Sequence, residues 1–123
     1  MLKLRYYCQG GGNTQIIRLL QEMKDKKNIS YEIMDLSNNE REKQVYETDF
    51  KPRAKILKRR TGKSIYKELR GKRSHRYYIS LPGTIAIIKN GQVEWWTYTI
   101  DEMIYLLNQA LSQGQNFLEK LCT

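Results

Sequence analysis

Two β-prone runs flank the dipeptide Asn90-Gly91, and this pattern constrains the fold more than any other in the chain. Asn and Gly tolerate the positive φ angles of a type I′ turn, the favoured two-residue connection between antiparallel strands. Pro82 precedes the first run, and because proline lacks the N–H that a sheet interior needs, it should begin this strand. Counting outward from the turn predicts these cross-strand pairs: Ile88 with Val93, Ile87 with Glu94, Ala86 with Trp95 and Ile85 with Trp96.

The first 37 residues predict a strand, a helix and a second strand. Residues 2–7 alternate in the period of two that is typical of a strand, and residues 29–36 predict another. Between them Asn13 suits the N-cap of a helix, whose apolar positions are Ile16, Leu19, Leu20 and Met23. Strands joined by a helix of this length lie parallel. We therefore expect a βαβ unit.

Short helices are expected between the βαβ unit and Pro82. Residues 38–48 are polar and compatible with a helix, Pro52 interrupts them, and further helices are predicted over 53–60 and 64–69, the last stopping at Gly71.

After the Asn-Gly hairpin, Thr99 and Glu102 form the T-x-x-E pattern of a capping box. The helix that follows has apolar residues at helical spacing and Gly114 at its end, and residues 115–123 predict a short amphipathic extension that packs back. The chain therefore reads as one α/β domain over 1–123, with a basic helical insertion at about 38–78 and a C-terminal extension at 115–123.

Length and composition limit the class of protein. A chain of 123 residues with 40% hydrophobic residues is a single globular domain rather than a disordered one. No apolar run approaches the roughly 18 residues of a membrane span, and the charged N-terminus does not resemble a secretory leader, so we expect a cytoplasmic protein without membrane contact. Two distant cysteines and one histidine predict no metal site, and no cofactor is indicated.

The order of these elements resembles that of the thioredoxin-like superfamily. The resemblance depends on a cysteine at the mouth of the first helix, Cys8, and on residues 80–93, which are similar to the cis-proline strand and hairpin of thioredoxin. It covers residues 1–37 and 79–114. It implies a mixed four-stranded sheet flanked by helices, with Pro82 in a cis peptide beside Cys8. The arsenate-reductase-like branch is a weaker likeness, through residues 56–69.

The chain departs from the family at the reactive site. Thioredoxins and glutaredoxins carry C-x-x-C, whereas Cys8 is followed by Gln9, Gly10 and Gly11, so no resolving sulfur is present. A thiolate at Cys8 near a helix N-terminus would suit single-cysteine thiol–disulfide chemistry, catalysed with Pro82. The alternative is an inert, buried cysteine at the end of a strand. Whether the protein is an enzyme is left open by the sequence.

Two further segments predict binding. The loop Gly10, Gly11, Gly12 and Asn13 opens a helix, where an anion could lie against backbone N–H groups; a flexible turn is the other interpretation.

The net charge of +9 is concentrated in residues 51–76, which carry twelve Lys or Arg against one acid, Glu68. The residues that we expect to contact nucleic acid are Lys55, Lys58, Arg59, Arg60, Lys63, Lys67, Arg70, Lys72, Arg73 and Arg76. A solvated surface network is the alternative.

Three functional hypotheses follow. The first is a thioredoxin-fold thiol protein that acts through Cys8 on a protein or small-molecule thiol. The second is a nucleic-acid-binding module that uses residues 51–76, and the third is a regulatory protein that docks on another protein through the same basic segment. A homodimer through the outer strand of the hairpin is also compatible with the sequence.

Overall fold

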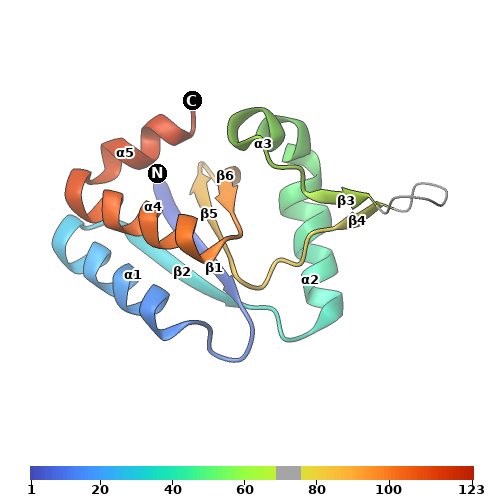
Figure 1. Ribbon diagram of the computed structural model, residues 1–123, viewed down its shortest axis with the longest axis horizontal. Helices are drawn as coiled ribbons and strands as arrows, with labels where there is room; N and C mark the ends of the chain where they lie inside the picture. Colours follow the sequence, from blue (N-terminus) through green and yellow to red (C-terminus); the bar gives the residue numbers. More distant parts are fainter. Residues whose placement is uncertain (69–75) are drawn as a thin grey trace.

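The computed structural model describes the backbone of residues 1–68 and 76–123, and the side chains of residues 1–65 and 79–123 (Figure 1). In chain order the elements are β1 (Leu2–Cys8), α1 (Thr14–Lys27), β2 (Ser30–Asp35), α2 (Asn39–Val45), the π-helical turn η1 (Tyr46–Phe50), the 3₁₀ turn η2 (Lys51–Arg53), α3 (Ala54–Thr61), β3 (Tyr66–Glu68), β4 (Arg76–Tyr78), β5 (Thr84–Lys89), β6 (Gln92–Thr97), α4 (Ile100–Gln113) and α5 (Gln115–Leu121).

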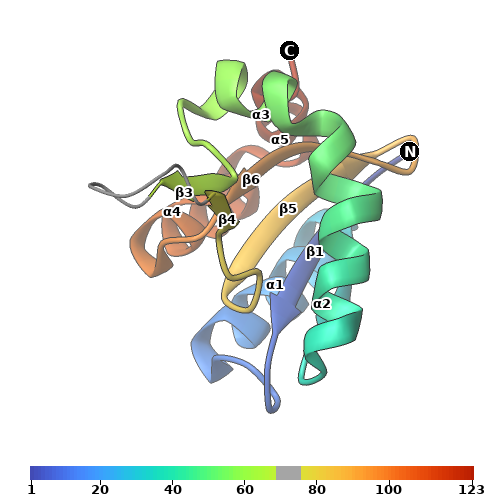
Figure 2. The same cartoon turned by 90° about the vertical axis from the view of Figure 1, so that its right-hand side faces the viewer.

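A mixed four-stranded sheet forms the centre of the molecule. Its strand order is β2-β1-β5-β6. β1 and β2 are parallel, as the predicted βαβ unit requires, and β5 is antiparallel to both β1 and β6. Helices α1, α4 and α5 cover one face, while α2 and α3 lie on the other (Figures 1 and 2). The predicted α/β class, with a four-stranded mixed sheet flanked by helices, is confirmed.

Each face of the sheet has its own core, because successive side chains of a strand point to opposite faces. Leu4 and Tyr6 of β1 pack with Ile16, Leu20 and the buried side of α4. Tyr7, on the opposite face, belongs to a second core under α2 and α3. Aromatic rings dominate that second core: Phe50 makes edge contacts with Tyr7 at 5.5 Å and with Trp96 at 5.9 Å between ring centroids.

The predicted turn at Asn90-Gly91 is present, but the predicted register is wrong beyond its first pairs. Both residues have positive φ, as a type I′ turn requires. Ile88 pairs with Val93 as expected, whereas Ile87 pairs with Trp95 because a β-bulge inserts Glu94 as an extra residue. The bulge explains how Val93 and Trp96 face the second core while Trp95 packs against the first.

The helix predicted over residues 64–69 is wrong. Its described part contains strand β3, whose Tyr66 pairs with Tyr78 of β4 in an antiparallel hairpin. The predicted end of that helix at Gly71 lies outside the described residues. Figures 1 and 2 show β3 and β4 standing off the four-stranded sheet. The base of the hairpin is held by the buried Ile65, whose carbonyl accepts a hydrogen bond from the Ile79 N–H at 2.8 Å.

The remaining helix predictions are close to the structure. Asn13 caps α1 with its side-chain oxygen, which accepts from the N–H groups of Gln15 and Ile16. α3 ends at Gly62 in the left-handed conformation, and α5 buries Leu118 against the first core. No helix in the described ranges has the length and apolar character to cross a membrane.

Candidate functional site

Cys8 lies at the end of β1 with a buried side chain. In the parallel register it is the partner of Asp35 on β2, and its carbonyl accepts a hydrogen bond from Leu36 N–H at 2.8 Å. Burial raises the pKa of the Cys8 thiol above its ordinary value, and the negative charge of Asp35 raises this pKa further. The environment therefore favours the neutral thiol, which is the opposite of what a thiolate nucleophile needs.

The segment that contains Pro82 lies beside the end of β1. The predicted cis form of the peptide bond before Pro82 is wrong. The register pairs Tyr7 with Thr84, and the Gly83 N–H donates to the Tyr7 carbonyl at 2.7 Å, so Cys8 and Pro82 occupy the same end of adjacent strands. No peptide bond among the described residues is cis. Gly83 has a φ of 89°, and a trans proline followed by such a glycine is typical of a type II turn.

Three N–H groups at the start of α1 have partners within the protein. Asn13 N–H donates to the Tyr6 hydroxyl, and the N–H groups of Gln15 and Ile16 donate to the side chain of Asn13. Gly12 has a packing role: a Cβ at this position would lie 2.9 Å from the Tyr6 ring and 3.1 Å from the Cys8 Cβ. The local structure thus explains both Gly12 and Asn13 without a ligand.

Both thiols should react slowly in the folded protein. Burial raises the pKa of Cys122 to about 11, and the pKa of Cys8 is also raised, so at neutral pH each thiolate fraction is below that of a free cysteine. Alkylation with iodoacetamide at about pH 7, followed by peptide mapping, should modify Cys8 at least tenfold more slowly in the folded chain than in urea. Faster alkylation of Cys8 in the folded chain would reveal a reactive thiolate.

The inner face of α3 carries cations that are paired with an acid of β6. Leu57 is fully buried in the second core, and Arg53 and Arg60, one turn to either side of it, reach Glu94. Arg60 donates to Glu94 Oε2 at 2.6 Å and to the Glu94 carbonyl at 2.8 Å, while Arg53 pairs with Oε1. The Glu94 side chain is only 12% exposed. These two arginines therefore anchor α3 to the sheet.

Lys63 is also paired with an acid, because its ammonium group forms an ion pair with Glu102 of α4. The predicted capping box is wrong, because Thr99 caps α4 without a side-chain hydrogen bond and Glu102 turns to other donors. Glu102 Oε2 accepts from Lys63 Nζ and from the Thr97 hydroxyl, and these donors hold the pKa of the Glu102 carboxyl below its ordinary value. Sequence reasoning missed Glu94 and Glu102 as counter-charges, since their distance in sequence from α3 gives no local signal.

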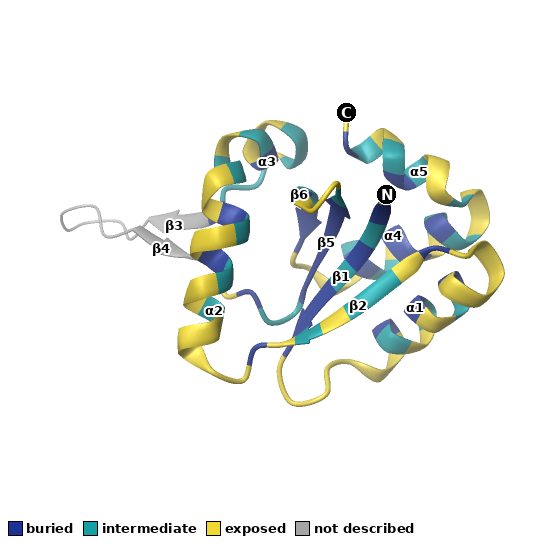
Figure 3. Ribbon diagram, turned by 180° about the vertical axis from the view of Figure 1, so that it is seen from behind, coloured by how far each residue is buried: buried dark blue, intermediate teal, exposed yellow. Residues whose placement is uncertain are grey.

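The outer face of α3 carries the cations that remain. Lys55, Lys58 and Arg59 are exposed and are spaced three and four residues apart, so they share one side of α3. Figure 3 shows exposed residues among the half-buried ones of this helix. Within the described part of the chain, no carboxylate pairs with any of them, whereas Lys51 pairs with Glu47. The outer face of α3, defined by Lys55, Lys58 and Arg59, is thus a positive surface that no described carboxylate neutralises.

The other predicted cations belong to the β3–β4 hairpin. Lys67 lies on β3 and Arg76 on β4, where Arg76 pairs with Glu68 in the backbone register. Arg70, Lys72 and Arg73 lie outside the described residues. Among described side chains, no group of three or more His, Cys, Asp or Glu is placed to hold a metal ion.

Comparison with known proteins gives a family. The chain matches no curated protein and no solved structure at a significant level. The sequence model of a family described as a domain of unknown function, DUF8045, matches residues 4–123. This match spans every element from β1 to α5, including α3 and the β3–β4 hairpin. The chain therefore belongs to the DUF8045 family.

Proposed function

We propose that this protein is a nucleic-acid-binding module that holds a phosphate backbone against the outer face of α3 and the β3–β4 hairpin. One observation carries the proposal. The cations of residues 53–63 divide into an inner set that is neutralised by Glu94 and Glu102, and an outer set on α3 that has no acidic partner among the described side chains. Unpaired, exposed cations on one side of a helix can each neutralise a phosphate and release its counterions.

The position of the hairpin supports the same proposal. β3 and β4 stand off the main sheet, and the sequence of residues 66–78 carries five Lys or Arg against one acid. The sequence therefore places further cations on a hairpin that follows the basic helix α3, and a series of cations along the chain suits an extended polyanion better than a compact acidic ligand.

The four-stranded sheet acts as a scaffold in this proposal. We propose that it is a thioredoxin-like sheet, since a parallel β1–β2 pair joined to the antiparallel β5–β6 hairpin agrees with the mixed four-stranded sheet that the sequence resemblance implies. The thiol chemistry of that superfamily is not part of the proposal, because Cys8 is buried and the pKa of its thiol is raised. A fold can be kept while its site is lost or replaced.

The test is a titration of labelled RNA and DNA oligonucleotides, single- and double-stranded, followed by fluorescence anisotropy at several salt concentrations. Three phosphate contacts from α3 alone predict that the logarithm of the association constant falls with the logarithm of salt with a slope of about −2.7 on duplex, and more steeply if the hairpin also contributes. Absent or salt-independent binding would remove the proposal. Binding of acidic peptides in preference to oligonucleotides would favour the protein-docking hypothesis instead.

A further inference from the structure

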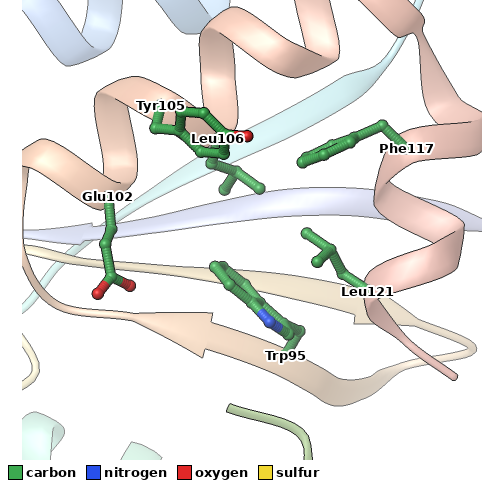
Figure 4. A pocket seen from close by; sticks show the side chains of 6 residues that line it. All are labelled: Trp95, Glu102, Tyr105, Leu106, Phe117 and Leu121. Carbon is green, nitrogen blue, oxygen red and sulfur yellow. The ribbon is translucent and has the colours of Figure 1, made fainter.

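An apolar pocket of about 280 Å³ opens between β6, α4 and α5 (Figure 4). It is lined by Trp95, Glu102, Tyr105, Leu106, Phe117 and Leu121. Three aromatic rings from three different elements face this space: Trp95 from β6, Tyr105 from α4 and Phe117 from α5. Tyr105 is 61% exposed, so its ring is open to solvent at the edge of this pocket.

The pocket and α3 lie on opposite faces of the sheet, and both contact the edge strand β6. β6 is an edge strand, and consecutive residues of it serve the two sites: Glu94 holds the arginines of α3 on one face, and Trp95 lines the pocket on the other. Lys63, just after α3, pairs with Glu102 of the pocket wall. Its Nζ also lies 6.0 Å from the ring centroid of the exposed Tyr98. A polynucleotide that contacts both α3 and the pocket must therefore pass around the edge strand β6.

The chemistry of the lining selects the part of a polynucleotide that would enter. Aromatic rings stack on nucleobases of any sequence. The Glu102 carboxylate repels a phosphate, but it can accept a hydrogen bond from the amino group of a base, as carboxylates do from cytosine N4. Both described hydrogen bonds to this carboxylate use Oε2, so Oε1 has no hydrogen-bond donor among the described residues.

We propose that the pocket receives an unstacked base of a single-stranded nucleic acid whose phosphates lie along the outer face of α3. The proposal rests on the proposed function and extends it from nucleic acid in general to single strands. A base in a duplex is stacked on both faces and paired along one edge, so it cannot enter the pocket. A duplex can therefore use the phosphate contacts but not the pocket. Single strands should therefore bind more tightly than duplexes of equal length.

The test compares Tyr105→Ala with Ile33→Ala, which removes an exposed apolar side chain from β2 at the opposite edge of the sheet. Tyr105→Ala should weaken single-strand binding about tenfold, because one stacking contact is lost. It should leave duplex binding and the salt dependence unchanged, since no phosphate contact is removed. Ile33→Ala should have no effect on either ligand.

Tryptophan fluorescence provides a second readout. Trp96 is fully buried, whereas Trp95 lines the pocket, so stacking of a base should quench Trp95, and the quenching should be absent in Trp95→Phe. A single strand with abasic residues should bind without quenching. Equal affinity for single strands and duplexes, with no effect of Tyr105→Ala, would overturn the pocket assignment and leave the phosphate surface intact.

Two other outcomes would also decide against the inference. Absence of binding to any oligonucleotide would remove the proposed function and the pocket assignment together. Quenching of Trp95 by tetramethylammonium, with none by oligonucleotides, would identify the three rings as a cage for a methylated cation. We expect no such quenching, because Lys63 already pairs with the carboxylate that would attract the cation.

Discussion

Replacement of Lys55, Lys58 and Arg59 by glutamine in one variant should weaken oligonucleotide binding about 100-fold at physiological salt, because each lost phosphate contact costs roughly a factor of five. The three side chains are exposed and without acidic partners in the described part of the chain, so the fold does not depend on them. The free energy of unfolding should change by less than about 0.5 kcal/mol. Fluorescence anisotropy and urea denaturation measure the two quantities.

A matched control separates the surface from the net charge. Lys24, Lys26 and Lys27 are exposed in the last turn of α1, and α1 covers the opposite face of the sheet from α3. Their replacement by glutamine removes the same total charge. We expect this control to weaken binding less than about threefold, as a change in long-range attraction alone does. Equal losses in both variants would show that only the overall charge matters and would contradict an interface on α3.

Replacement of Glu94 by glutamine should destabilise the protein by about 3 kcal/mol, because it leaves two largely buried arginines without their counter-charge. The side chains of Arg53 and Arg60 are 19% and 18% exposed, so solvent compensates little of the loss. Urea denaturation followed by circular dichroism measures the change. The effect is large for this chain because the same carboxylate holds both ends of α3 to β6.

The control for this variant is Glu47→Gln, which breaks an exposed pair between Glu47 and Lys51 one helical turn apart. It should cost less than about 0.5 kcal/mol, as exposed ion pairs generally do. If Glu94→Gln destabilises the protein no more than Glu47→Gln does, the inner cations of α3 are not anchors. The distinction between an inner and an outer set of cations would then fail.

Local sequence signals were sufficient for the elements that depend on few neighbours. The alternation in β1, the Asn13 cap of α1 and the Asn90-Gly91 turn are each decided within a few residues, and all three are present. The register of the β5–β6 hairpin, in contrast, depends on residues that are distant in the sequence. The bulge at Glu94 places this carboxylate against two arginines more than thirty residues earlier in the chain, and no sequence pattern within the hairpin predicts that contact.

The short segment around Tyr66 is a case in which the local sequence pattern predicts the wrong element. Ile65, Tyr66 and Leu69 have spacing that is compatible with one side of a helix, yet β3 forms because Arg76–Tyr78 supplies a partner strand. Pairing between strands of three residues is set by tertiary structure rather than by propensity.

Some features of the candidate sites could be predicted from the sequence, and others depend on contacts between distant elements. The basic segment was recognised from the composition, and the placement of Pro82 near the end of β1 was implied by the resemblance to the thioredoxin-like superfamily. Which cations face inward depends on the rotation of α3 against β6, and the state of Cys8 depends on burial and on Asp35 across the sheet. These are contacts between elements, so they required the structure.

The most direct measurement of the central claim, that the outer face of α3 contacts phosphates, is the salt dependence of oligonucleotide binding in the wild type and in the Lys55/Lys58/Arg59 variant. Loss of three phosphate contacts predicts that the slope of log K against log salt on a duplex becomes shallower by about 2.7 in the variant. The slope of the α1 control should equal that of the wild type. Identical slopes for all three proteins would show that α3 touches no phosphate and would contradict the account.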